Sequence, residues 1–227
     1  MAFIADTIGN TPMVELQKMS KNPAVKIFAK LEGNNPGGSV KDRPAFNMIK
    51  SALDRGDINS NTRLIEATSG NTGIAIALAA SLFNMKAELV MPASSTRERV
   101  LTMEAFGATV TLLDSIEACR DYAEAKAAKG EGFLLNQFAN PDNYMAHYKT
   151  TAPEIWRDTN GKITHFVSAM GTTGTIMGCS RFLKEKNPAV HIAGCQPTDE
   201  SSIPGIRKWP AAYLPKIFEP ERVDSVI

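Results

Sequence analysis

Short β-rich runs alternate along the chain with longer stretches in which apolar residues recur every three or four positions. This alternation is typical of βα units and predicts an α/β fold with mostly parallel sheets. The predicted strands are 25–30, 64–67, 88–91, 109–113, 133–136, 164–168 and 191–195. The predicted helices are 43–55, 71–83, 97–106, 116–128, 150–157 and 175–185. The turn-rich segment 140–143 (NPDN) is the predicted crossover between two lobes.

Composition excludes several classes of function. The 227 residues include 25 basic and 24 acidic side chains, and a net charge of +1 favours neither a nucleic acid nor an anionic membrane as a partner. No apolar run approaches the ~20 residues that span a bilayer, and no signal peptide is evident, so we expect a soluble, cytoplasmic protein. The three cysteines are odd in number and widely spaced, which argues against a disulfide framework.

The histidines do not predict a metal site. His147, His165 and His191 lie far apart, and none has metal-ligand spacing with a cysteine or a carboxylate. His165 and His191 fall inside predicted strands, where we expect packed, hydrogen-bonded core positions.

The first segment with candidate chemistry is 33–43 (GNNPGGSVKDR), which follows a strand and opens a helix. A lysine at a helix start is ordinarily a solvated residue, although the positive end of the helix dipole disfavours it there. The same dipole would lower the pKa of the Lys41 amine and make it nucleophilic. The segment is not a nucleotide-binding P-loop, because serine rather than lysine follows Gly38.

Two further turns contain glycine and threonine. In 66–73 (EATSGNTG), the backbone N–H groups of a helix start, together with the hydroxyls of Thr68, Ser69 and Thr72, could bind a carboxylate or phosphate. A simple capped helix explains this turn equally well. In 170–175 (MGTTGT), two glycines permit close backbone approach and three threonines add donors, which suits a phosphate. The pattern is not G-x-G-x-x-G, which disfavours NAD.

A candidate nucleophilic lysine with two anion-binding turns suggests a cofactor that carries a carbonyl and a phosphate, and a substrate that carries a carboxylate. Pyridoxal 5′-phosphate acting on an amino acid fits that description.

The segments TIGNTPMVEL, LEGNNPGGSVKDR, EATSGNTGIA, GTTGT and SSIPGIRKWP resemble the cysteine synthase (O-acetylserine sulfhydrylase) family in order and spacing. The resemblance runs from about Thr7 to the end of the chain. LEGNNP, NQFANPDN and SSIPGIRKWP resemble the B-type branch in particular. The family has the two-lobed, tryptophan-synthase-β-like fold of fold-type-II pyridoxal-phosphate enzymes. The expected lobes are therefore a smaller, mobile one (35–142) and a larger one (1–34 with 143–227).

The resemblance also implies roles for individual residues. Lys41 matches the Schiff-base lysine, and Asn71 matches the asparagine that hydrogen-bonds the ring hydroxyl of the cofactor. The match to the cofactor phosphate loop covers Gly171, Thr172, Thr173, Gly174 and Thr175. The match to the site for the substrate α-carboxylate covers Thr68, Ser69, Thr72 and Gln137.

The implied reaction is a β-replacement. Lys41 would hold the cofactor, release it to the amino group of O-acetylserine and then remove the α-proton, after which acetate leaves and sulfide adds to give L-cysteine. B-type members have a roomier site that also accepts thiosulfate and yields S-sulfocysteine. Arg207 and Lys208 are candidates to assist that larger anion, and a solvated surface loop is the alternative for both. The family resemblance further implies a homodimer.

Other interpretations stay open. Cystathionine synthase and serine/threonine dehydratase share the fold class, and a truncated, non-catalytic paralogue could act as a binding or regulatory protein. Family members continue with a G-x-S-S-G-type turn whose serine meets the pyridine nitrogen of the cofactor. This sequence stops in a strand-like run, 222–227, before such a turn. We therefore expect these 227 residues to be less than the whole functional chain, with the C-terminal part of the larger lobe missing.

Overall fold

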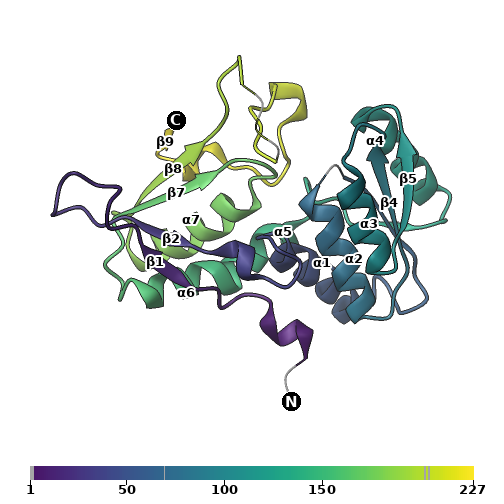
Figure 1. Cartoon of the computed structure of the whole chain (residues 1–227), viewed down its shortest axis with the longest axis horizontal. Coiled ribbons are helices and arrows are strands. Elements are labelled where there is room, and N and C mark those ends of the chain that lie inside the picture. Colours follow the sequence, from purple (N-terminus) through teal and green to yellow (C-terminus); the bar gives the residue numbers. More distant parts are fainter. Residues whose placement is uncertain (1–2, 69, 202, 204) are drawn as a thin grey trace.

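The computed structural model describes residues 3–68, 70–201, 203 and 205–227. Its first sheet is parallel, in the order β5-β4-β3-β6. The strands are β3 (Leu64–Ala67), β4 (Ala87–Pro92), β5 (Thr109–Leu113) and β6 (Phe133–Leu134). The helices that accompany them in Figure 1 are α1 (Asp42–Arg55), α2 (Asn71–Leu82), α3 (Arg97–Ala105) and α4 (Ile116–Ala128).

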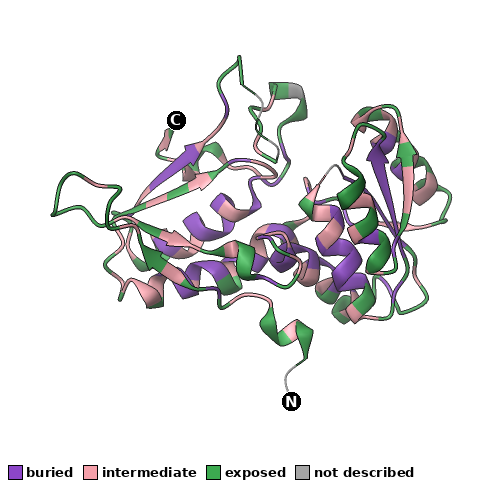
Figure 2. Cartoon of the chain, in the orientation of Figure 1, coloured by how far each residue is buried: buried purple, intermediate pink, exposed green. Residues whose placement is uncertain are grey.

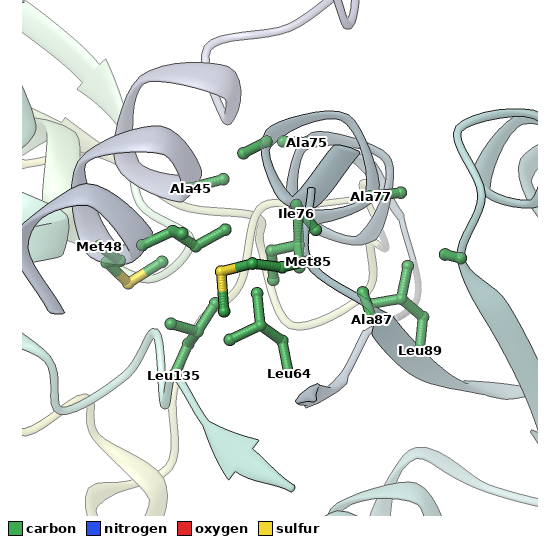
Figure 3. Close-up of a cluster of buried hydrophobic side chains, with 14 of the residues drawn as sticks. Ala45, Met48, Leu64, Ala75, Ile76, Ala77, Met85, Ala87, Leu89 and Leu135 are labelled. Carbon is green, nitrogen blue, oxygen red and sulfur yellow. The ribbon is translucent and has the colours of Figure 1, made fainter. Parts of the chain in front are cut away.

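Side chains alternate between the two faces of this sheet, as the twofold period of a strand requires. Leu64 and Leu89 pack into a core with α1, α2 and α3, and Ile65 and Val90 pack against α4. Figure 3 shows residues of the larger of these two cores, and Figure 2 shows β4 buried along its length and the middle of α2 buried. Helix α2 is buried on several sides, since Gly73 and all residues from Ala75 to Ala80 are buried.

A second parallel sheet has the order β7-β8-β9, formed by β7 (His165–Ala169), β8 (His191–Cys195) and β9 (Ser225–Val226). Its core includes residues of α6 (Ala152–Asp158) and α7 (Gly174–Lys186). An antiparallel pair, β1 (Met13–Glu15) and β2 (Phe28–Lys30), precedes α1. Short 3-10 helices cover Ile4–Thr7, Glu32–Asn34, Ala211–Tyr213 and Pro220–Arg222.

The predicted elements differ from the structure mainly between the two sheets. Segment 140–143 begins a helix, α5 (Pro141–Ala146), because the Asn140 side chain accepts a hydrogen bond from Asp142 N and Pro141 stands at the first helical position. A π-helical turn, His147–Thr151, joins α5 to α6, so helix extends well upstream of the predicted start at 150. The predicted strand 25–30 shortens to β2, and β1 was not predicted.

The histidine expectations were partly wrong. His165 is exposed on β7, where its ring lies 2.9 Å from Thr164 Oγ1 and beside the ring of His191, and Val167 and Ala169 on the same face are exposed too. His191 is half-buried, with its Nε2 2.9 Å from Ser225 Oγ. Among the described residues, none of the helices is both long and apolar enough to cross a membrane.

Candidate functional site

Lys41 stands directly before α1 and is half-buried. Burial lowers the pKa of its amine below the ordinary lysine value, and the charge of Glu32 acts in the opposite direction. Within the part of the chain that the structure describes, the Lys41 side chain has no hydrogen bond or ion pair. A lysine amine that is desolvated and without a partner is suited to act as a nucleophile and as a base.

The turn before α2 begins at the end of β3. The Thr68 hydroxyl accepts hydrogen bonds from Gly73 N (3.1 Å) and Gly70 N (3.4 Å), so it caps the helix while its own proton remains available. Asn71 is exposed at the first position of α2. Both interpretations of this turn fit the structure. Thr68 caps the helix, and the remaining N–H groups of the helix start stay available for an anion. Ser69 lies outside the described residues.

The turn before α7 is built differently. Thr173 has a left-handed backbone conformation (φ +69°), and its buried hydroxyl has no hydrogen-bond partner in the structure. A Cβ on Gly174 would collide with the Asn143 side chain, and one on Gly171 would collide with the carbonyl oxygen of Gly205. Glycine is thus required at both positions because neighbouring groups approach the backbone closely.

Hydrogen bonds join the two turns. The Thr72 hydroxyl donates to Gln137 Oε1 at 3.0 Å, and Asn143 Nδ2 donates to the Gln137 carbonyl oxygen at 2.7 Å. The same Asn143 nitrogen donates to Thr172 Oγ1 at 3.1 Å. One continuous polar assembly therefore connects the turn before α2, the candidate carboxylate site, to the turn before α7, the candidate phosphate site. Gln137 and Asn143 link the two.

Three residues have supporting roles that the sequence analysis did not assign. Asn143 links the two turns, and His147 lies beneath the second, with Nε2 3.3 Å from Thr175 Oγ1 and Nδ1 2.9 Å from Thr151 Oγ1. Burial, aided by the charges of Lys41 and Arg43, lowers the pKa of His147 to about 3, so the ring is neutral. The i, i+4 spacing of His147 and Thr151 was a visible signal of a shared helix face, and Asn143 carried none.

Glu66 is the third. Its buried carboxylate accepts hydrogen bonds from Asn136 N (3.0 Å) and Gln137 N (3.4 Å), which fixes the segment that carries Gln137. Burial raises the pKa of Glu66 to about 7, against the effect of those hydrogen bonds. The glutamate two residues before Thr68 was visible in the sequence, but its partners lie 70 residues away.

The loop that carries Arg207 touches the second turn through its backbone. Arg207 N donates to Met170 O at 2.8 Å, and Trp209 Nε1 donates to Gly171 O at 2.7 Å. The Arg207 side chain is exposed, with its guanidinium 5.6 Å from the centre of the Trp209 ring, and Lys208 pairs with Asp199. The loop thus contacts the candidate phosphate turn, while the charged group of Arg207 lies at the surface.

The residues present fit a cofactor with a phosphate and a carbonyl. An unpartnered, buried hydroxyl at the start of a 13-residue helix suits a phosphate oxygen, and a lysine amine whose pKa is lowered by burial suits a carbonyl carbon. Lys41, Asn71 and residues 171–175 are the groups that would hold such a cofactor.

Comparisons with known proteins agree with this chemistry. Residues 4–222 match the family described as pyridoxal-phosphate dependent enzyme. The chain is 56% identical to cysteine synthase B of Pseudomonas aeruginosa, over 99% of this chain and 76% of the relative. It is 54% identical to cysteine synthase B of Salmonella typhimurium, over 100% of this chain and 76% of that relative.

A solved structure, O-acetyl serine sulfhydrylase isoform 3 from Entamoeba histolytica, superimposes with a TM-score of 0.90 at 38% identity, covering 100% of this chain and 72% of the other. The match therefore extends over nearly the whole chain in both sequence and fold, which confirms the α/β fold of type II. The chain belongs to the pyridoxal-phosphate-dependent enzyme family, and within that family to the cysteine synthases.

Proposed function

We propose that the protein makes L-cysteine from O-acetylserine and sulfide, with pyridoxal 5′-phosphate as cofactor, and that thiosulfate can replace sulfide to give S-sulfocysteine. The observation that carries the proposal is the hydrogen-bonded assembly in which Gln137 and Asn143 connect the turn before α2 to the turn before α7. It would hold two anion sites at a fixed separation, one for the carboxylate of the substrate and one for the phosphate of the cofactor.

In this proposal the turn before α7 holds the phosphate through the first N–H groups of the helix and the Thr173 hydroxyl. The turn before α2 holds the substrate carboxylate through N–H groups and the hydroxyls of Thr68 and Thr72. Asn71 would hydrogen-bond the ring hydroxyl of the cofactor and so orient the cofactor ring. Each of these groups is set by a helix start, so little reorganisation is needed on binding.

Lys41 performs the proton transfer. When bound, pyridoxal phosphate withdraws electrons from the α-carbon of the substrate, which makes the α-proton acidic and lets the β-substituent depart. Burial lowers the pKa of the Lys41 amine, which favours the neutral nitrogen that can accept the α-proton. Sulfide or thiosulfate then replaces acetate at the β-carbon.

Product analysis tests the proposal. Purified protein is offered O-acetylserine or O-phosphoserine, each with sulfide or thiosulfate, and the amino-acid products are identified by mass. We expect cysteine with sulfide and S-sulfocysteine with thiosulfate. Absence of both products from protein that contains its full complement of cofactor would contradict the proposal.

We also propose that residues 35–142 move as a smaller lobe, that the protein is a homodimer, and that it works in the cytoplasm. The family resemblance supports all three. Light scattering of the purified protein, fractionation of the source cells, and small-angle scattering with and without substrate test them separately.

A further inference from the structure

The π-helical turn between α5 and α6 packs directly against α7. A Cβ on Gly178 of α7 would collide with the carbonyl oxygen of Tyr144 and with the Cβ of His147, so the two backbones touch at this point. His147 and Thr151, at the two ends of the turn, are 1% and 3% exposed. The packing therefore fixes how far a side chain of this turn lies from the start of α7.

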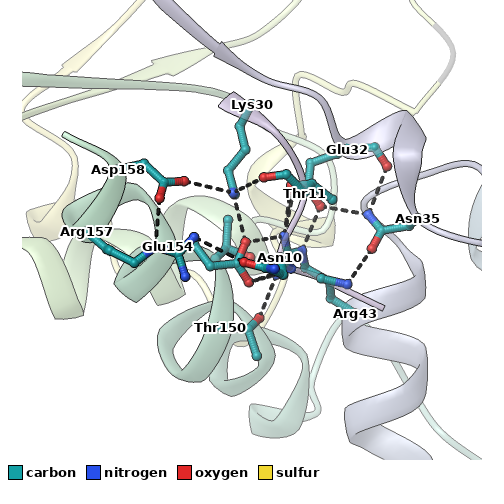
Figure 4. A network of polar contacts seen from close by, with 12 residues as sticks. Asn10, Thr11, Lys30, Glu32, Asn35, Arg43, Thr150, Glu154, Arg157 and Asp158 are labelled. Atoms are coloured by element: carbon teal, nitrogen blue, oxygen red, sulfur yellow. Dashed lines mark hydrogen bonds and ion pairs between the residues drawn. The ribbon is translucent and has the colours of Figure 1, made fainter. Parts of the chain in front are cut away.

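The same turn is also held by Arg43 (Figure 4). Arg43 Nη1 donates to Thr150 Oγ1 at 3.1 Å, and Thr150 Oγ1 donates to Ala146 O at 2.7 Å. The guanidinium fork of Arg43 donates in addition to both carboxylate oxygens of Glu32 and of Glu154, at 2.7–2.8 Å. This buried cluster ties the π-helical turn to α1 and α6.

The His147 ring lies between two threonine hydroxyls. Its Nδ1 is 2.9 Å from Thr151 Oγ1, and its Nε2 is 3.3 Å from Thr175 Oγ1. Among the described residues, neither hydroxyl has another hydrogen-bond partner. Burial holds the pKa of the ring at about 3, so one ring nitrogen carries a proton and the other can only accept one.

Two arrangements of the protons satisfy these contacts, and each leaves one threonine proton without an acceptor in the described structure. If Nδ1 carries the proton and donates to Thr151, then Thr175 donates to Nε2 and the unpaired proton belongs to Thr151. If Nε2 carries the proton and donates to Thr175, then Thr151 donates to Nδ1 and the unpaired proton belongs to Thr175. Thr151 is buried, whereas Thr175 is half-buried at the start of α7. An unpaired donor costs more when it is buried, so the second arrangement is favoured.

We propose that His147 is a positioning residue for the Thr175 hydroxyl: Nε2–H donates to Thr175 Oγ1, which leaves the Thr175 proton for the anion held by the turn before α7. Thr151 selects this tautomer by donating to Nδ1. A hydroxyl that accepts from an N–H group and donates to a charged oxygen is held in one orientation. The inference rests on the proposed role of this turn in binding the cofactor phosphate.

The first measurement reads the tautomer directly. The full chain is labelled with ¹⁵N-histidine, freed of cofactor and shown by circular dichroism to remain folded. The sequence contains three histidines, so variants at His165 and His191 identify the signals of His147 by elimination. Nitrogen chemical shifts separate a protonated ring nitrogen from an unprotonated one. We expect the proton of His147 on Nε2, and a proton on Nδ1 would overturn the inference whether or not the chain binds cofactor.

The second measurement tests the effect on the anion. Cofactor-free variants are titrated with pyridoxal 5′-phosphate and with pyridoxal, which lacks the phosphate. His147→Asn, whose amide is too short to replace Nε2–H, should bind pyridoxal 5′-phosphate about threefold to tenfold more weakly and pyridoxal as the parent does. His147→Gln, whose longer amide can donate in place of Nε2–H, should bind both as the parent does. If the ring instead accepted the Thr175 proton, His147→Asn would bind pyridoxal 5′-phosphate more tightly.

A double variant separates positioning from a general structural role. Thr175→Val should weaken binding of pyridoxal 5′-phosphate by about tenfold or more. Adding His147→Asn should cause no further loss, because the ring acts only through the Thr175 hydroxyl. His191→Asn is the matched control: it loses the same kind of ring contact, to Ser225 Oγ outside the site, and should leave binding unchanged.

The outcomes distinguish the inference from the proposed function. Losses that add in full in the double variant, or tighter binding by His147→Asn, would overturn the inference while the proposed function stands. A parent chain that binds no pyridoxal 5′-phosphate would contradict the proposed function instead. If His147→Asn does not fold, the tautomer of His147 in the parent chain still decides.

Discussion

The turns before α2 and α7 come from the same pattern of strand, glycine- and threonine-containing turn, and buried helix, yet they differ in how far their own polar groups are satisfied. In the first, the hydroxyls of Thr68 and Thr72 already have protein partners. In the second, the Thr173 hydroxyl is buried without one. A buried, unpartnered hydroxyl lowers stability unless a ligand meets it, whereas a satisfied cap stabilises its helix.

The difference suggests a division of labour. The second turn is preorganised for one anion that stays bound, which suits a resident cofactor. The first turn keeps its shape without a ligand, which suits a substrate that arrives and leaves. The following predictions test this comparison.

Lys41→Ala should separate binding from chemistry most completely. Both turns are left intact, so cofactor should still bind without a covalent link, while turnover falls by at least about a thousandfold because the base is lost. Borohydride reduction and peptide mapping should place the cofactor on Lys41 in the unmodified protein and nowhere in the variant. Labelling of Lys30 or Lys50 instead would refute the assignment.

Asn143→Ala should uncouple the two turns. The variant loses the hydrogen bonds to Gln137 and Thr172, and we expect cofactor affinity and substrate affinity both to fall, each by roughly 1–3 kcal/mol. Fluorescence titrations measure both. Asn47→Ala, which loses a hydrogen bond from α1 to the neighbouring Asp142 carbonyl, is the control and should change neither affinity. Loss of only one affinity would mean that the turns act independently.

Valine substitutions of two threonines should give opposite effects on stability. Thr173→Val removes an unpartnered hydroxyl, so the cofactor-free chain should be as stable as the parent or more so, with cofactor bound about tenfold more weakly. Thr68→Val removes a helix cap and should cost about 1 kcal/mol of stability and weaken the substrate carboxylate site. Urea unfolding and binding titrations measure these effects. If Thr68→Val lost cofactor instead, the two anion sites would have been assigned in reverse.

The last prediction concerns how the stability of the chain depends on pH through Glu66, whose carboxylate holds the segment that carries Gln137. The pKa of Glu66 is about 7 in the folded state, above its ordinary value of 4.5, so the folded chain binds the proton more tightly than the unfolded chain. Its contribution is therefore greatest below about pH 4.5 and is lost as the pH rises to 7. The free energy of unfolding, relative to Glu66→Gln, should fall by about 1–3 kcal/mol over this range. A flat difference would contradict the shifted pKa.

Much of the fold could be predicted because its signals are local. The strands at 64–67, 109–113 and 191–195 and the helix at 116–128 have the predicted limits in the structure. The errors lie where a local signal was ambiguous. Proline and asparagine in segment 140–143 favour a turn and a helix start alike, and burial of Asn143 and Ala146 selected the helix.

The candidate site divides in the same way. Sequence alone indicated the lysine at a helix start and the two glycine- and threonine-containing turns, because the residues of each motif are neighbours in the chain. The links between them were not accessible. Asn143 reaches Thr172 across 29 residues, Glu66 reaches Asn136 across 70, and Arg43 reaches Glu154 across 111.

The sequence by itself therefore determined the order of strands and helices, the motifs at the helix starts and the family resemblance that these motifs carry. The tertiary structure decided which hydroxyl lacks a partner, which carboxylate the Arg43 fork engages and which amine is desolvated. The physical reason is that periodicity and capping act between residues a few positions apart. Burial and the pairing of distant charges depend on which elements pack together, and these set the pKa values and the unsatisfied groups on which the proposed chemistry depends.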